Sequence, residues 1–117
     1  MKLVYLASPY RSKDEWGLHQ NIHHAHKAAR QIWQISSLVC ISPCSNTAFF
    51  GGDDIPDSVW LEGDIEILRR CDALFLNEGW ENSSGCIDEK TFAEKIGLPV
   101  FTTLDDLQEW AICARDI

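Results

Sequence analysis

Glu89 is the residue of this sequence whose surroundings point most directly to chemistry. It follows a small polar turn at residues 82–85, within a helical pattern that ends at Gly97 and Pro99. Three apolar residues lie three, four and seven positions after it and share its helix face: Phe92, Ala93 and Ile96. Solubility does not explain a carboxylate on that side of a helix. Its placement is explained if the carboxylate contacts a ligand at the edge of a sheet.

Asp64 repeats this placement in the preceding helical segment. Three apolar residues lie four and three positions before it and four positions after it: Trp60, Leu61 and Leu68. Two carboxylates on inward helix faces suit paired acid–base or nucleophilic work. The alternative is that one or both are structural acids, satisfied by a hydroxyl, an arginine or a backbone amide. For the pair, we favour the functional interpretation.

The elements that must position these carboxylates alternate along the chain. Short apolar runs predict four strands: Leu3–Ala7, Leu38–Ile41, Ala73–Leu76 and Val100–Thr102. Between and after them we expect four helices. The first is capped by Ser12 and is firm from Asn21 to Ile35, and the second is capped by Asp57 and runs to about Arg70. The third carries Glu89, and the fourth is capped by Thr103 and runs to about Ala114. Residues 42–56 are expected to form a long loop.

This alternation predicts an α/β fold, a three-layer flavodoxin-like sandwich with a small parallel sheet in the order 2-1-3-4. Ligands of such folds collect at the carboxyl ends of the strands. The segments expected there are Ser8–Ser12, residues 42–57 and Asn77–Gly85. The chain of 117 residues is interpreted as a single domain, 1–117.

Composition and charge limit the classes of ligand and the compartment that are expected for this protein. The net charge of −8 argues against nucleic acid, but it allows a small phosphorylated ligand held by backbone N–H groups at a helix start. No apolar run is long enough to span a membrane, and the first apolar run reads as a strand, not a signal peptide. Five cysteines without a CxxC pair indicate reduced thiols and a cytoplasmic protein.

Three other features have less specific interpretations. Four histidines crowd the first helix, and two of them have the spacing of a metal pair: His19, His23, His24 and His26. We favour a solvated helix face and assign no metal. Trp80, beside the polar turn, has two interpretations: a core or interface residue, which we favour, or an aromatic ring that stacks on a ring of the ligand. Cys86 has no neighbouring base in the pattern, so we do not assign it as a nucleophile.

The chain resembles the nucleoside 2-deoxyribosyltransferase superfamily, particularly its short branch. The resemblance covers most of the chain and rests on the order and spacing of several short motifs: YLASPYR at residues 5–11, Asn21, Ile41–Pro43, Trp60 with Asp64, Cys71–Ala73, GWENSSGCIDE at residues 79–89, and Gly97–Val100. Two positions depart from the family pattern. Ser83 stands where transferases often have an aspartate, and Ser37 replaces a glycine that ends the first helix.

The resemblance implies roles for particular residues. Glu89 would be the nucleophile that attacks the sugar C1′, while Asp64 and Tyr5 would orient the sugar and assist proton transfer. Arg11 and Ser83 would hold a 5′-phosphate, as in nucleotide-hydrolysing relatives. The remaining substrate-binding positions would be Ser8, Pro9, Ser84, Gly85 and Trp80. No cofactor or metal is implied.

We therefore expect cleavage, by hydrolysis or transfer, of the N-glycosidic bond of a (deoxy)nucleoside or its 5′-monophosphate. The alternatives are a non-catalytic nucleotide sensor with the same pocket and an interaction protein with a tryptophan-rich surface. The resemblance and the aromatic content also imply a homodimer or higher homo-oligomer. Its expected contact surface is the first helix with the loop after the second strand, where three aromatic residues gather: Trp33, Phe49 and Phe50.

Overall fold

Four parallel strands form one sheet in the computed structural model, which describes residues 1–48, 50 and 54–115. The strands are β1 (Lys2–Ala7), β2 (Leu38–Ile41), β3 (Ala73–Leu76) and β4 (Val100–Phe101). Their order is β2-β1-β3-β4, with Val4 of β1 paired with Cys40 of β2 and Ala73 of β3. The predicted parallel sheet and its order 2-1-3-4 are confirmed.

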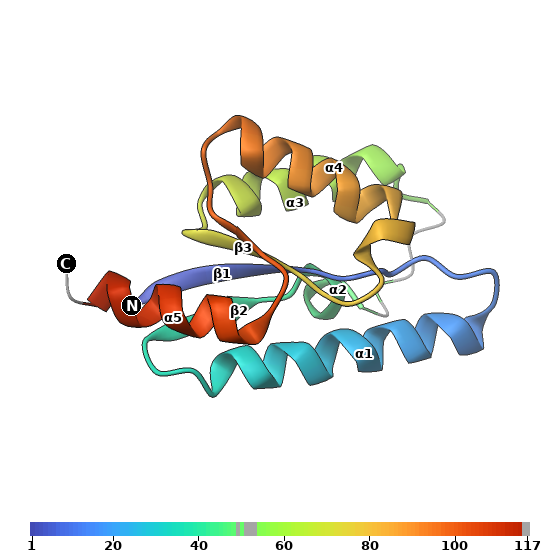
Figure 1. Ribbon diagram of the computed structural model, residues 1–117. Coiled ribbons are helices and arrows are strands. Elements are labelled where there is room, and N and C mark those ends of the chain that lie inside the picture. The colour runs from blue at the N-terminus through green and yellow to red at the C-terminus, as the bar shows by residue number, and fades with distance from the viewer. Residues whose placement is uncertain (49, 51–53, 116–117) are drawn as a thin grey trace.

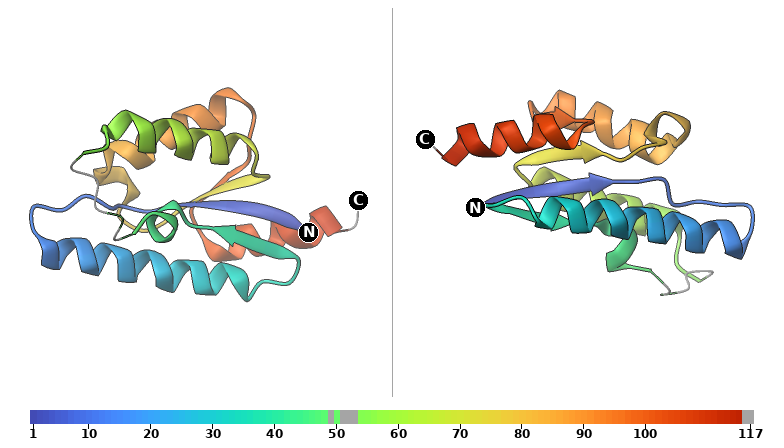
Figure 2. Two further views of the ribbon diagram at one scale, coloured as in Figure 1. Left: turned by 180° about the vertical axis from the view of Figure 1, so that it is seen from behind. Right: turned by 60° about the horizontal axis from the view of Figure 1, so that its bottom comes forward.

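Helices cover both faces of this sheet (Figure 1). The helices are α1 (Glu15–Trp33), α2 (Pro43–Asn46), α3 (Asp57–Arg69), α4 (Ser84–Lys95) and α5 (Leu104–Arg115), with a short 3-10 helix η1 (Trp80–Asn82) before α4. Helices α1 and α5 pack on one face, and α3 and α4 pack on the other. Seen from behind, α2 follows directly on the tip of β2 (Figure 2). The three-layer sandwich is confirmed.

Side-chain alternation along the strands divides the core into two halves. Val4 and Leu6 of β1 pack against α1 and α5, whereas Tyr5 and Ala7 point to the opposite face. That second face is closed by Leu68 of α3 and by residues of α4. The period of two therefore places Tyr5 on the same side of the sheet as the helices that carry Asp64 and Glu89.

Two helix starts differ from the sequence prediction. Asp14, not Ser12, is the N-cap of α1, because its Oδ1 accepts a 2.7 Å hydrogen bond from the backbone N–H of Gly17. With this cap α1 begins at Glu15, six residues before the expected firm start. In α3 the N-cap is Pro56, and no side chain caps the helix. Asp57 is the first helical residue, and its carboxylate pairs with Arg11 instead.

The other element ends differ less. The expected loop after β2 contains the short helix α2, which starts at Pro43, and proline is favoured at a first helical position. Thr103 caps α5 as predicted, with its Oγ1 accepting from the N–H of Asp106 at 3.2 Å. Ser37, between α1 and β2, adopts a left-handed conformation with φ of 74°. It thus occupies the conformation for which glycine is the usual residue.

Candidate active site

A cavity of about 800 Å³ opens at the carboxyl end of the sheet. It is walled by the end of β1, by α2, by α3 and by the start of α4. Nine of the ten predicted site residues line it: Tyr5, Ser8, Pro9, Arg11, Asp64, Ser83, Ser84, Gly85 and Glu89. Residues from four separate parts of the chain therefore meet where ligands of parallel α/β sheets bind.

Tyr5 is completely buried at the floor of this cavity. Its hydroxyl makes no hydrogen bond of normal length and angle within the part of the chain that the structure describes. Burial raises the pKa of the phenol, and the negative charges of Glu89 and Asp64 raise it further. Tyr5 therefore stays protonated, and its hydroxyl can donate to a carboxylate or a ligand in the cavity.

Glu89 and Asp64 are partly buried and face the same cavity as Tyr5. Withdrawal from solvent raises the pKa of Glu89 to about 7, the charges of Asp64 and Asp88 add to the rise, and the hydroxyl of Tyr5 opposes it. Withdrawal from solvent also raises the pKa of Asp64. Glu89 can therefore gain or lose a proton near neutral pH, and the pKa of Asp64 is shifted in the same direction. Acid–base chemistry uses neighbouring carboxyls whose pKa values are shifted in this way.

Ser8 is held by a hydrogen-bond network at the strand ends. The side-chain amide of Asn77, which follows β3, donates to Ser8 Oγ at 3.0 Å and to the carbonyl of His24 at 3.4 Å. The thiol of Cys44 donates to the Ser8 carbonyl at 3.5 Å. Because Ser8 Oγ accepts from Asn77, its own proton remains to be donated to a ligand. Asn77 was expected at this sheet edge with the rest of its segment, but not as the residue that positions Ser8. A polar residue directly after a buried strand was a signal for that role.

The start of α4 forms another wall. Ser83 is the N-cap, and its Oγ accepts a 3.3 Å hydrogen bond from the N–H of Cys86. The N–H groups of the first helical turn have no partners within the helix and point toward its N-terminal end, where an anion or a polar ligand atom is favoured.

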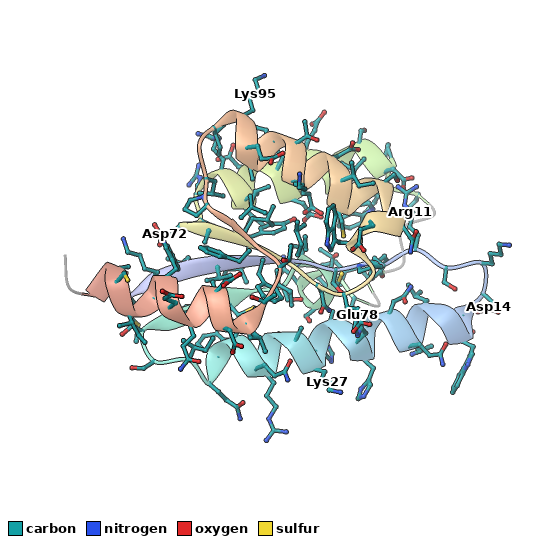
Figure 3. The ribbon with its side chains drawn as sticks, viewed as in Figure 1. Arg11, Asp14, Lys27, Asp72, Glu78 and Lys95 are labelled. Atoms are coloured by element: carbon teal, nitrogen blue, oxygen red, sulfur yellow. The ribbon has the colours of Figure 1, made fainter. Side chains whose placement is uncertain are left out.

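Arg11 lies at the mouth of the cavity and is already paired. Its Nη2 donates to Asp57 Oδ2 at 3.0 Å, and both side chains are largely exposed. The loop that carries Arg11 is tied to α1 by Asn21, whose amide donates to the carbonyls of Tyr10 at 2.9 Å and Arg11 at 3.2 Å. Figure 3 shows Arg11 toward the carboxyl end of the sheet, with Asp72 at the other end.

Comparison with known proteins places the chain in a family. Residues 2–104 match the family described as “Domain of unknown function (DUF1937)”. The chain belongs to the DUF1937 family. A comparison of this DUF1937 domain with curated proteins finds no match.

Solved structures share the fold of this DUF1937 domain. One is the 2-deoxyribosyltransferase from the psychrotolerant bacterium Bacillus psychrosaccharolyticus, with a TM-score of 0.62 and 19% identity over 84% of this chain and 69% of that one. Another is the 2-desoxiribosyltransferase from Leishmania mexicana, with a TM-score of 0.60 and 16% identity over 88% of this chain and 66% of that one. The DUF1937 domain thus spans about two thirds of these structures. At such identities the likeness confirms the expected resemblance at the level of the fold.

Trp80 is the predicted site residue that the structure does not place in the cavity wall. Its ring packs against the core between the sheet and α3–α4, and Lys90 Nζ lies 5.8 Å from the ring centroid. The cavity wall of the DUF1937 domain contains Trp60 instead, which packs edge-on against Phe50 with 6.3 Å between ring centroids. From the sequence, Trp60 was identified as a helix-face residue and as part of a family motif, but not as a site residue.

Two of the four histidines of α1, His19 and His24, contact other protein groups. His24 Nε2 forms a 2.9 Å hydrogen bond with the carbonyl of Glu78, and His19 Nε2 lies 3.6 Å from Glu15 Oε1. Within the described ranges of the DUF1937 domain, no three His, Cys, Asp or Glu side chains are grouped so that they could hold a metal ion.

All five cysteines are free thiols, and burial raises the pKa of the Cys86 thiol to about 11. None of the described helices combines the length and apolarity that a bilayer crossing requires.

Proposed function

We propose that this DUF1937 domain cleaves the N-glycosidic bond of a (deoxy)nucleoside or its 5′-monophosphate, by hydrolysis or transfer, with Glu89 as the nucleophile. The observation that carries the proposal is the meeting of Glu89, Asp64 and the buried hydroxyl of Tyr5 in one cavity at the carboxyl edge of the sheet. The fold shared with two 2-deoxyribosyltransferases supports this choice of reaction.

The reaction would run in two steps. The ionised carboxylate of Glu89 attacks C1′ while the C1′–N bond breaks and its electron pair leaves with the base. A proton from Asp64 neutralises the departing base. Water or a second base then attacks C1′ of the glycosyl ester, Asp64 accepts the proton of the incoming group, and the carboxylate of Glu89 is released.

The surroundings of Glu89 suit this role. Positive charge builds on the sugar as the glycosidic bond breaks, and a carboxylate in a poorly solvated site stabilises that charge more strongly than it would in water. The hydroxyls of Tyr5 and Ser8 would donate to Glu89 or to sugar oxygens and so fix the sugar over the nucleophile. None of these steps requires a metal or a cofactor.

The remaining wall residues would bind the rest of the substrate. Arg11, Ser83, Ser84 and the α4 start at Gly85 would meet the 5′ substituent, and Pro9 would shape that side of the cavity. Trp60 is placed to stack on the base. The reduced thiols support the cytoplasm as the working compartment of the enzyme.

The decisive experiment follows base release by liquid chromatography from a panel of nucleosides and nucleoside 5′-monophosphates, with and without an acceptor base. The wild-type protein should release the base from at least one of them. Glu89→Gln should abolish release but still bind the substrate, because the amide keeps the shape of the side chain and loses its nucleophilicity. Glu94→Gln is the matched control: the same change on the exposed side of the same helix, which should leave turnover intact.

A trapping experiment separates the roles of the two carboxylates. A 2-fluoro-2-deoxyarabinosyl nucleoside slows the second step, and mass spectrometry of the digested protein should find the sugar on the peptide that carries Glu89. Sugar on Asp64 would reverse the two roles. A thermal shift with nucleotides but no released base would make the protein a non-catalytic nucleotide sensor, and no shift with any of them would favour an interaction protein.

A further inference from the structure

We propose that Asp57 makes this site select nucleosides with a free 5′-hydroxyl over their 5′-monophosphates. This inference rests on the proposed function and names its substrate class. It reverses the preference that the sequence resemblance implied for Arg11 and Ser83. The structure supplies two observations for it: the pairing of Arg11 and the charge of the cavity wall.

Arg11 does not present a free positive charge to the cavity. It is bound to Asp57, which comes from the first turn of α3, 46 positions away in sequence, at 3.0 Å between Nη2 and Oδ2. Both residues line the cavity. An exposed ion pair contributes little to folding stability. The main effect of Asp57 is therefore on the charge of the cavity mouth. Its carboxylate lies beside the Arg11 guanidinium, which is the group that would have to bind a phosphate.

The rest of the cavity wall is acidic. Arg11 is the one Lys or Arg among the described residues that line it, against four acidic side chains, of which Glu89 and Asp64 have raised pKa values and are the less fully ionised: Asp57, Asp64, Asp88 and Glu89. A 5′-phosphate adds a charge of about −1.5 to −2 at neutral pH. It would approach these carboxylates with the positive charge of Arg11 largely neutralised by Asp57.

The α4 start does not offset this repulsion. The positive end of a helix dipole is worth only about half an elementary charge. The hydroxyl of Ser83, which accepts from the N–H of Cys86, can donate one hydrogen bond to a phosphate but brings no positive charge. An uncharged 5′-hydroxyl, in contrast, can accept from the free donors of Arg11 without meeting repulsion from Asp57. The site therefore selects by what it repels as well as by what it binds.

The test compares kcat/KM for one deoxynucleoside and its 5′-monophosphate. Both compounds carry a base that the wild-type protein is known to release from the panel. The wild type should use the nucleoside at least about tenfold better. Asp57→Asn should raise the ratio of monophosphate to nucleoside about tenfold, which is the scale of removing one charge several ångströms from a dianion in a water-like dielectric. The gain should shrink at high salt. Glu62→Gln, which removes an exposed charge from α3 outside the cavity, should leave the ratio unchanged.

Each outcome decides one point. A wild type that prefers the monophosphate, or an unchanged ratio in Asp57→Asn, overturns the selectivity proposal while leaving the enzyme intact. Asp57→Ser provides the same loss of charge if Asp57→Asn does not fold. If the wild type releases no base from any nucleoside or 5′-monophosphate of the panel, the proposed function fails instead. One deoxynucleoside and its 5′-monophosphate are then compared by calorimetric Kd in the wild type and in Asp57→Asn, and the affinity ratio tests Asp57 alone.

Discussion

Glu89 is costly to the folded protein for the same reason that it suits chemistry. Its pKa of about 7 lies above the ordinary value of 4.5, mainly because the carboxyl is withdrawn from solvent. The folded state therefore holds this proton more tightly than the unfolded state does. The folded state is stabilised when Glu89 is protonated rather than ionised. This stabilisation is fully present below about pH 4.5 and is lost as the pH rises through about 7.

We predict that Glu89→Gln removes this pH dependence. Glutamine stays neutral, so the variant should gain stability relative to the wild type as the pH rises from 5 to 8, by up to about 3 kcal/mol in the free energy of unfolding. Urea unfolding at both pH values measures the change. A gain of the same size at pH 5 and pH 8 would show that Glu89 does not have a raised pKa. Glu94→Gln is again the control, because Glu94 is exposed.

In the proposed mechanism, Asp64 donates a proton to the leaving base and accepts one from the incoming group. We predict that Asp64→Asn lowers turnover about a hundredfold or more while the fold is retained, since a positioned acid–base group contributes on that scale. Steady-state kinetics, together with circular dichroism of the purified variant, checks both parts. A variant that fails to fold would identify Asp64 as a structural acid and would refute its assignment as the proton donor.

At the scale of the elements, the connection between α1 and β2 carries backbone strain. Ser37 has a φ of 74°, and its carbonyl accepts a 2.9 Å hydrogen bond from the N–H of Lys2. A residue with a Cβ is disfavoured in this left-handed conformation, whereas glycine adopts it freely. The bond to Lys2 joins this turn to the start of β1, so the strain lies where β2 and β1 enter the sheet.

We predict that Ser37→Gly stabilises the protein by up to about 1 kcal/mol, because relief of the strain outweighs the extra freedom of glycine in the unfolded chain. Thermal or urea unfolding measures the change. Gln34→Gly is the opposite control: Gln34 has an ordinary φ of −76°, so glycine there should destabilise the protein. If both substitutions destabilise to the same extent, the left-handed turn stores no strain.

At the scale of the whole molecule, β2 is an edge strand with a groove beside it. The groove is lined by residues of α1, β2 and α2, including Trp33, Ile41 and Asn46. Trp33 is 55% exposed. Phe50 is 66% exposed but does not line this groove, and its ring contacts Trp60. Phe49 lies outside the described residues. An exposed aromatic side chain such as Trp33 beside an edge strand is typical of a surface that associates.

We predict that the protein is a homodimer or a higher homo-oligomer that uses this surface. Sedimentation at micromolar concentration should show an assembly, and Trp33→Gln should weaken it about tenfold or more, as loss of a buried tryptophan does at interfaces. Trp16→Gln, at the far end of α1, is the matched control because Trp16 is 71% exposed. A fully active monomer of 13.3 kDa would exclude the assembly.

Local patterns determined most of the architecture. The runs that became β2 and β3 were delimited to the residue, because a strand buried on both faces must be apolar throughout. The inward placement of Asp64 and Glu89 followed from helical periodicity within single segments. The sheet order followed from the alternation of strands and helices, which permits few topologies.

Tertiary structure decided what these residues meet. Asp57 was predicted to cap its own helix, but packing brings it to Arg11, 46 positions away, where it alters the charge of the cavity. The hydrogen bond from Asn77 to Ser8 joins residues 69 positions apart and depends on the register of β1 against β3. The sequence pattern reports which face a side chain occupies, because that depends on neighbours a few residues away. It does not report which distant side chain arrives opposite, because that depends on how separate elements pack.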